Sequence, residues 1–255
     1  MTTEHSIILG YVMAIAIGVS LYMTLYVTKR QFQLVAFSLL LGGIVAAFSR
    51  GPWVGAAAIL FIYFVLEGKR GFKKIATGIL LIALGLFILT VIGWSEKILS
   101  YMPFIGSVDS ENVDYRKRLF EVSMDRIYEN PWLGSSDYLS KMEEMRQGQG
   151  IIDLVNTYLV VSLNSGLVGL SLFVLFFFTT LIGVSKVLRN KIVPLNQKSL
   201  GNVLFSTMMG ILLTIFTCSP MSLVPLMYWL FSSLCLVYVK LNSPPNPQLI
   251  SESTM

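Results

Sequence analysis

The polar segment YRKRLFEVSMDRIYENPWLG occupies residues 115–134 and lies within the one long stretch that is not hydrocarbon-like, Trp94 to Asn156. Its apolar residues recur with the period of an amphipathic helix. The predicted stripe consists of Leu119, Phe120, Ser123, Met124, Ile127 and Tyr128. Pro131 and Gly134 follow and are expected to end the helix. The sequence therefore predicts a surface helix between two strongly apolar regions.

Three consecutive bases, Arg116, Lys117 and Arg118, are expected in the first turn of this helix. The helix dipole favours acids there, so the arrangement costs a few tenths of a kcal/mol unless an anion lies nearby. One interpretation is therefore an anion-binding helix end. The other is a solvated basic turn that pairs with neighbouring acids, namely Asp109, Glu111 or Asp114.

The composition of the chain is that of a membrane protein. Of its 255 residues, 55% are hydrophobic and 13% are charged, and the mean hydropathy is +0.71. A soluble domain carries about a quarter charged residues. The basic residues that give a net charge of +5 cluster in short segments between apolar runs, as in membrane proteins, so no nucleic-acid partner is expected. The predicted fold class is all-α, a polytopic membrane helix bundle.

Seven apolar runs predict about seven transmembrane helices in a single membrane domain, residues 1–255. They lie at about 7–28, 32–48, 53–66, 75–93, 156–184, 201–218 and 221–239. Basic segments at 29–30, 67–74 and 186–198 place those ends in the cytoplasm by the positive-inside rule. The amino terminus is then outside. Residues 94–154 form a large extracytoplasmic loop that carries the amphipathic helix, and residues 241–255 form a disordered cytoplasmic tail.

The absence of charged residues from the centres of the predicted spans argues against a transporter. None of the seven runs has an ionisable residue near its centre, where transporters and pumps usually place them. Charged residues that can meet a ligand lie at the predicted outer surface instead: Arg50, the basic triplet at 116–118, and Asp153. Cys218 and Cys235 fall in apolar runs and are interpreted as small buried hydrophobes.

Arg50 belongs to a sharp turn, Ser49 to Pro52, in which Gly51 is expected to supply flexibility and Pro52 to begin a helix. In one interpretation Arg50 only snorkels at the membrane boundary and caps the turn. In the other, it adds a planar guanidinium to a helix N-terminus that already favours anions, which suits phosphate oxygens.

Three segments carry a resemblance to a known family. SRGPWVGAAAILFIYF (49–64) is similar to a Ser-Arg-Gly turn followed by an apolar helix. Arg116, with an aromatic residue four positions later and Pro131 in NPWLG, resembles an outer-loop helix that ends in Pro-x-x-Gly. VNTYLVVSLNSGLVGL (155–170) is similar to a His-Asn-x-Tyr-Leu segment. In this order, from about Phe32 to Val239, they resemble the carboxyl-terminal half of the O-antigen ligase and polymerase family.

This resemblance implies a multi-pass glycosyltransferase of the bacterial inner membrane. In that family a sugar hydroxyl attacks the anomeric carbon of a glycan carried on undecaprenyl diphosphate, and no metal or cofactor is implied. Arg50, Arg116 and Arg118 would bind the diphosphate, and the nearby carboxylates Asp153, Glu143 and Glu144 are the candidate bases. The expected partners are the lipid-linked glycan, membrane lipids and other polysaccharide-assembly proteins. The sequence has no Gly-rich nucleotide loop, so nucleotide-sugar donors are not expected.

Two departures from the family leave alternatives open. Val155 stands where ligases have histidine, and the single histidine, His5, lies near the amino terminus. A polymerase-like enzyme is therefore favoured over a ligase. Family members usually have more spans before this region, so the chain resembles a short or truncated representative. The alternative is a non-catalytic remnant or accessory subunit of a polysaccharide export or assembly system, and a transporter or flippase comes third.

Overall fold

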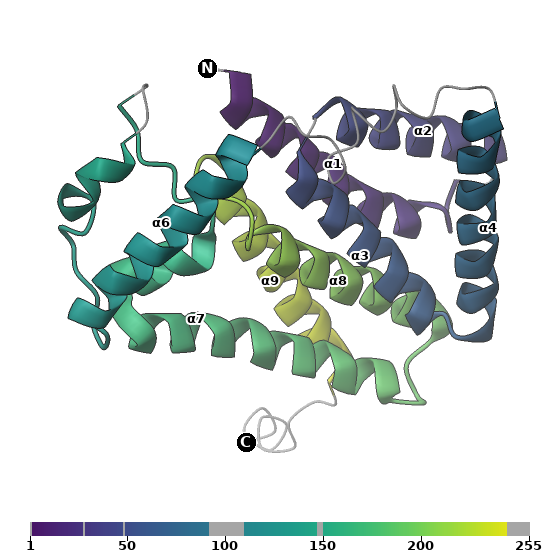
Figure 1. Ribbon diagram of the computed structural model, residues 1–255. Helices are drawn as coiled ribbons and strands as arrows, with labels where there is room; N and C mark the ends of the chain where they lie inside the picture. The colour runs from purple at the N-terminus through teal and green to yellow at the C-terminus, as the bar shows by residue number, and fades with distance from the viewer. Residues whose placement is uncertain (1, 28, 48, 92–109, 147–149, 244–255) are drawn as a thin grey trace, which may run out of the picture.

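The computed structural model describes residues 2–27, 29–47, 49–91, 110–146 and 150–243, and within them the fold is entirely helical (Figure 1). The all-α prediction is confirmed for this part of the chain. The helices are α1 (Thr2–Met23), α2 (Arg30–Ala46), α3 (Arg50–Leu66), α4 (Lys69–Val91), α6 (Ser110–Glu129), the short 3₁₀ helix η2 (Ser140–Met145), α7 (Thr157–Arg189), α8 (Leu195–Thr214) and α9 (Leu223–Asn242).

Three of the described helices are long and apolar enough to cross a membrane: α1 over Ser6–Met23, α7 and α9. α2 and α3 are apolar but shorter. Each of the seven predicted runs overlaps a helix, whereas the crossing of the bilayer by α2, α3, α4 and α8 stays a prediction. Of the predicted loop 94–154, residues 94–109 and 147–149 lie outside the described part. Of the predicted tail 241–255, residues 241–242 belong to α9, and residues 244–255 lie outside the described part of the chain.

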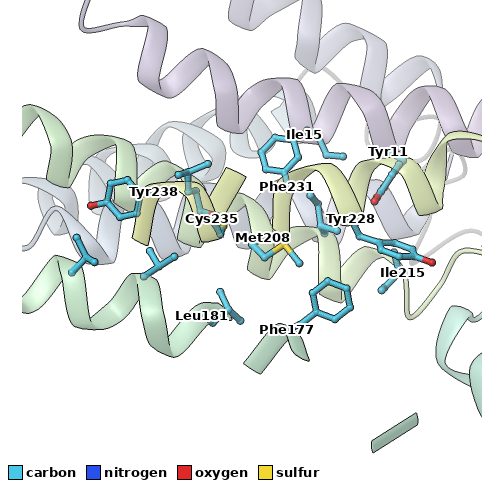
Figure 2. Packing of buried hydrophobic residues seen from close by; sticks show 14 of the residues in the cluster. Tyr11, Ile15, Phe177, Leu181, Met208, Ile215, Tyr228, Phe231, Cys235 and Tyr238 are labelled. Atoms are coloured by element: carbon cyan, nitrogen blue, oxygen red, sulfur yellow. Dashed lines mark hydrogen bonds between the residues drawn. The ribbon is translucent and has the colours of Figure 1, made fainter. Parts of the chain in front are cut away.

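The main core lies between α1, α7, α8 and α9 (Figure 2). Tyr11, Phe177 and Met208 are among its largest fully buried side chains. Phe173 of α7 makes edge-to-face contacts with Phe177 of the same helix and with Tyr228 of α9, with ring centroids 4.8 Å and 5.7 Å away. Such aromatic pairs contribute about 0.5–1.5 kcal/mol each beyond their burial. Packing in the core therefore fixes α7 and α9 against α8.

Small residues bring α3 close to α8. A Cβ added at Gly55 would lie 1.9 Å from Oγ1 of Thr214, and one at Gly51 would lie 2.0 Å from Oγ1 of Thr217. Gly51 is thus required for a close helix contact, and the flexibility expected of it is wrong, because it lies buried inside α3. At Gly169 of α7, by contrast, an added Cβ would meet only Ser165 of the same helix, so this glycine makes no close contact with another described helix.

The outer helix α6 differs from its prediction in two ways, namely in where it begins and in which of its residues are buried. It begins at Ser110, so the bases at 116–118 lie in its second and third turns and not in the first. The predicted conflict with the helix dipole is therefore removed. Leu119, Ser123 and Ile127 are buried as expected, but Phe120 and Tyr128 are 51% and 72% exposed. The buried stripe is narrower than predicted because α7 covers only one side of α6.

The basic segment predicted as a loop at 67–74 is mostly helical. α4 begins at Lys69, directly after a turn in which Gly68 has a φ of 70°. Lys74 Nζ lies 2.6 Å from the Glu67 carboxylate. The four bases of this segment are therefore carried on the first turns of α4, which packs against α3.

The long helix α7 is broken at Gly166, whose backbone has φ 63° and ψ −166°. The turn Pro131–Gly134 after α6 fits into this break. The Leu167 N–H donates to the Pro131 carbonyl (2.7 Å), and the Val168 N–H donates to the Trp132 carbonyl (3.2 Å). The Ser135 N–H donates in turn to the carbonyl of Leu163 (2.8 Å). Backbone groups that the break leaves without helical partners are thereby satisfied, as an apolar environment requires.

Gly166→Ala is expected to lower the thermal stability of the protein in detergent. The backbone angles of Gly166 belong to a region that is essentially restricted to glycine, where strain is about 1–3 kcal/mol. An added Cβ would also lie 2.3 Å from the Trp132 carbonyl oxygen. The matched control is Gly42→Ala in α2, where an added Cβ meets nothing within 4 Å. Equal melting temperatures for the two variants would contradict the proposed strain at the break.

Candidate functional site

The turn between α8 and α9, residues 215–222, is held at the start of α7. Thr157, the first residue of α7, is fully buried and donates its hydroxyl to the carbonyl of Cys218 (2.8 Å). Its backbone N–H donates to the carbonyl of Ile215 (3.0 Å). The preceding Asn156 caps α7, because its side-chain oxygen accepts from the N–H groups of Tyr158 and Leu159. The turn is thus fixed to a rigid helix end.

Asp153 lies beside this turn and is held there by two contacts. Its side-chain carboxylate accepts a hydrogen bond from the Ser219 hydroxyl. Its backbone carbonyl accepts one from the Tyr115 hydroxyl of α6 (3.3 Å). A carboxylate with a fixed position and a donor on one oxygen has its other oxygen available to accept a proton. Of the predicted carboxylates, Asp153 is therefore the one that the structure orients at the α8–α9 turn.

Arg50 is the first residue of α3 and lies next to the same turn. Its neighbour Gly51 approaches Thr217 so closely that an added Cβ would lie 2.0 Å from the threonine hydroxyl and 3.9 Å from the sulfur of Cys218. Ser49, at the N-cap position, makes no side-chain capping bond to α3. The positive end of the α3 dipole therefore lies beside residues 217–218, in the helix turn that carries Arg50.

Arg116 lies on the part of α6 that is nearest to this turn. Burial raises the pKa of the Cys218 thiol, and the positive charge of Arg116 is near enough to oppose that rise. Arg116 follows Tyr115, which holds Asp153, so α6 carries both residues to the turn. Figure 1 shows α6 and the α8–α9 turn at the same end of the bundle. Arg50, Arg116 and Asp153 thus belong to three separate segments that meet near this turn, and the side chain of Asp153 contacts it directly.

Val155 occupies the position where the resemblance places a histidine, and it is half-buried in a shallow pocket at this turn. Residues from four segments line the pocket: Ile7, Ile8, Asp153, Val155, Cys218, Ser219, Met221 and Val224. The pocket is predominantly apolar, with Asp153 and Ser219 as its polar members. A side chain at position 155 is thus close to the oriented carboxylate.

The remaining predicted site residues lie elsewhere. Glu143 is on η2, and the hydrogen bond from Arg146 holds the pKa of its carboxyl below the usual value. A carboxylate held in this way is a weaker base. Arg118 lies two residues from Arg116 and therefore on another side of α6, where its guanidinium is 3.7 Å from the carboxylate of Glu144. The structure does not bring these three residues to the α8–α9 turn.

The polar residues of the turn itself are not among the predicted site residues. Thr217 and Cys218 fall at the end of the predicted run 201–218, and Ser219 follows it directly. The available signal was a short polar group, TCSP, between two apolar runs. The described residues contain no cluster of three His, Cys, Asp or Glu side chains arranged to hold a metal ion. The chemistry available at the turn is therefore that of two arginines, one carboxylate and hydroxyl donors.

The fold and this site define a membrane protein with a charged site at one end of a helical bundle. A family model described as O-antigen ligase matches residues 35–174, which is more than half of the chain. The chain belongs to the O-antigen ligase family, and its function lies in glycan assembly at a membrane. No curated protein and no solved structure matches it significantly. The matched region contains Arg50, Arg116 and Asp153, while the α8–α9 turn lies beyond it.

Proposed function

We propose that this protein is a glycosyltransferase of the bacterial inner membrane that joins oligosaccharide units carried on undecaprenyl diphosphate. The observation that carries the proposal is the convergence of Arg50, Arg116 and Asp153 on the α8–α9 turn. Two cations and one oriented carboxylate are the groups needed to hold a diphosphate and to accept a proton from an attacking hydroxyl. The membrane-facing helices around the turn suit a donor with a lipid tail.

The diphosphate is held by the two arginines and the N-terminus of α3. Guanidinium groups bind phosphate oxygens through two parallel hydrogen bonds, and a helix N-terminus adds backbone N–H donors. Negative charge on the diphosphate grows as its bond to the sugar breaks. Donors that are already in place stabilise that charge more in the transition state than in the bound substrate.

Asp153 is the base in this proposal. The oxygen of an acceptor hydroxyl forms a bond to the anomeric carbon of the donor sugar, and the bond between that carbon and the diphosphate oxygen breaks. The electron pair of the broken bond stays on the lipid diphosphate. The hydroxyl proton moves to the carboxylate of Asp153, whose orientation Ser219 and Tyr115 maintain. Glu143 is engaged by Arg146 and takes no part.

The proposed acceptor is another lipid-linked glycan, which makes the enzyme polymerase-like. Val155 gives the pocket an apolar wall where a ligase would have histidine. The purified full chain in vesicles is expected to convert a lipid-linked repeat unit into longer lipid-linked chains. Val155→His is the companion variant. If only this variant transfers glycan to a lipid acceptor, the protein is a ligase that has lost its histidine. If neither protein gives a product, a non-catalytic or accessory subunit is favoured.

The proposed topology has seven spans, with α6 and the α8–α9 turn outside the cytoplasm. A cysteine at Lys117, exposed on α6, should react in intact cells with a thiol reagent that cannot cross membranes. A cysteine at Arg70, exposed on α4, should react only after the cells are opened. Cys218 and Cys235 are buried and give the background. Labelling of position 70 and not 117 in intact cells would reverse the orientation and remove the site from the side where lipid-linked glycans are joined.

A further inference from the structure

The break at Gly166 divides α7 into a short part before it and a longer part after it, and the length of the longer part matches the thickness of a bilayer. Residues 167–185 contain no charged side chain, and Lys186 and Arg189 follow in the last turn. At 1.5 Å per residue this part is about 28 Å long, close to the roughly 30 Å hydrocarbon core. If the bases mark one surface of the membrane, Gly166 lies at the other.

The turn that fills the break exposes two large apolar side chains at the same level. Trp132 and Leu133 are 68% and 77% exposed, although the carbonyls of Pro131 and Trp132 are bonded directly to the start of the second part of α7. Leu167 and Val168, which follow the break, are also exposed and begin the apolar surface of the span. The side chains of the turn therefore extend this surface outward.

The kinds of residue at this level are those of a membrane–water interface. Tryptophan and tyrosine are enriched there because one end of the ring system is apolar and the other can be hydrated. Tyr128, 72% exposed, lies one turn before Trp132. Farther back along α6, exposed positions such as Lys117, Glu121 and Asp125 are charged. Glu129, the last residue of α6, is also exposed and pairs with Arg126. The boundary between apolar and charged surface thus lies at the end of α6.

We propose that Trp132 and Leu133 insert into the lipid leaflet at the break of α7 and anchor the outer helix α6 to the membrane surface. The occupant of this apolar surface is lipid, because the surface is continuous with a membrane-spanning helix and lies one bilayer thickness from Lys186. The anchor depends on the membrane location of the chain and not on the transfer reaction. It fixes the height above the bilayer at which α6 carries Arg116.

The test uses the full chain with one cysteine introduced at a time, Leu133→Cys or, as the matched control, Asp125→Cys. Each cysteine carries an environment-sensitive fluorophore, and the parent protein, whose two cysteines are buried, gives the background. The proteins are placed in vesicles of phosphatidylethanolamine and phosphatidylglycerol. Part of the lipid carries a nitroxide quencher, either near the headgroup or near the end of the acyl chain. Gel-filtration profiles identical to that of the parent establish that the labelled variants are folded.

The fluorophore at position 133 should emit at shorter wavelength and be quenched several times more by the headgroup-level nitroxide than the fluorophore at 125. Aqueous iodide should quench position 125 and spare position 133. Equal iodide quenching at both positions would place the turn in water and overturn the anchor. Protection of position 133 from both nitroxides and iodide would mean that protein, such as a second copy of the chain, covers it. Stronger quenching by the chain-end nitroxide would place it too deep for an interfacial anchor.

Discussion

Asp153→Asn is expected to lower sugar transfer by about 10²–10⁴-fold, the contribution typical of a positioned general base. The substitution keeps the size of the side chain and its ability to accept a hydrogen bond from Ser219, but it removes the group that takes the proton. Folding should therefore change little. The measurement is the initial rate of chain growth from a purified lipid-linked unit, normalised to the amount of folded protein.

Glu143→Gln is the matched control for this result. Glu143 is an exposed carboxylate of the same outer region, but it pairs with Arg146 and lies away from the α8–α9 turn. Its removal should leave the rate nearly unchanged. An enzyme with Asp153→Asn that retains full activity would exclude Asp153 as the base, and a large loss in Glu143→Gln would transfer that role to η2.

Arg50→Ala and Arg116→Ala are each expected to reduce transfer by roughly 30- to 1,000-fold. This range corresponds to about 2–4 kcal/mol, the loss measured when one charge-stabilising donor is removed from a preorganised site. Lysine at either position should restore only part of the rate, because it keeps the charge and loses the planar fork. The double variant should lose less than the product of the single losses, since both groups act on one diphosphate.

Lys117→Ala is the control for nonspecific charge loss. Lys117 is exposed, as Arg116 is, and adjacent to it in sequence, but the rotation of about 100° per residue along α6 points the two side chains in different directions. Lys117→Ala should therefore change the transfer rate little. If α6 only attracted the anionic substrate by its overall charge, Lys117→Ala would lower the rate as much as Arg116→Ala. If Arg50→Ala and Arg116→Ala both remain fully active, the diphosphate clamp is wrong and Arg50 is only an anchor of the turn.

Much of the helical framework could be predicted because apolar runs are long and the signals that end them are local. The positions of α1, α7 and α9 follow from uninterrupted apolar residues, and the end of α6 follows from Pro131. The predicted start of α6 is several residues too late because the predicted apolar stripe begins at Leu119, while the first turn, residues 110–113, has only Val113 as an apolar residue. Local chemistry therefore located helices better than it located their first turns.

The site could be predicted only in part, because its geometry depends on contacts between distant segments. Arg50, Arg116 and Asp153 were recognised as charged residues at one surface, and their meeting point was not. That point, Thr217 to Ser219, is set by the approach of Gly51 to α8 and by the bond from Thr157 to Cys218. Neither a glycine nor a threonine in an apolar run signals its partner in the sequence. The different surroundings of Arg116 and Arg118 likewise follow from how α6 packs.

The break at Gly166 has a consequence for how the chain is made. Ribosomes deliver residues 131–134 before residue 166, so the carbonyls of Pro131 and Trp132 exist before the N–H groups of Leu167 and Val168 that need them. The hydrogen-bond partners of the break are therefore already present when residues 157–168 fold. The two parts of α7 can then form directly on either side of Gly166, without an unbroken helix as an intermediate.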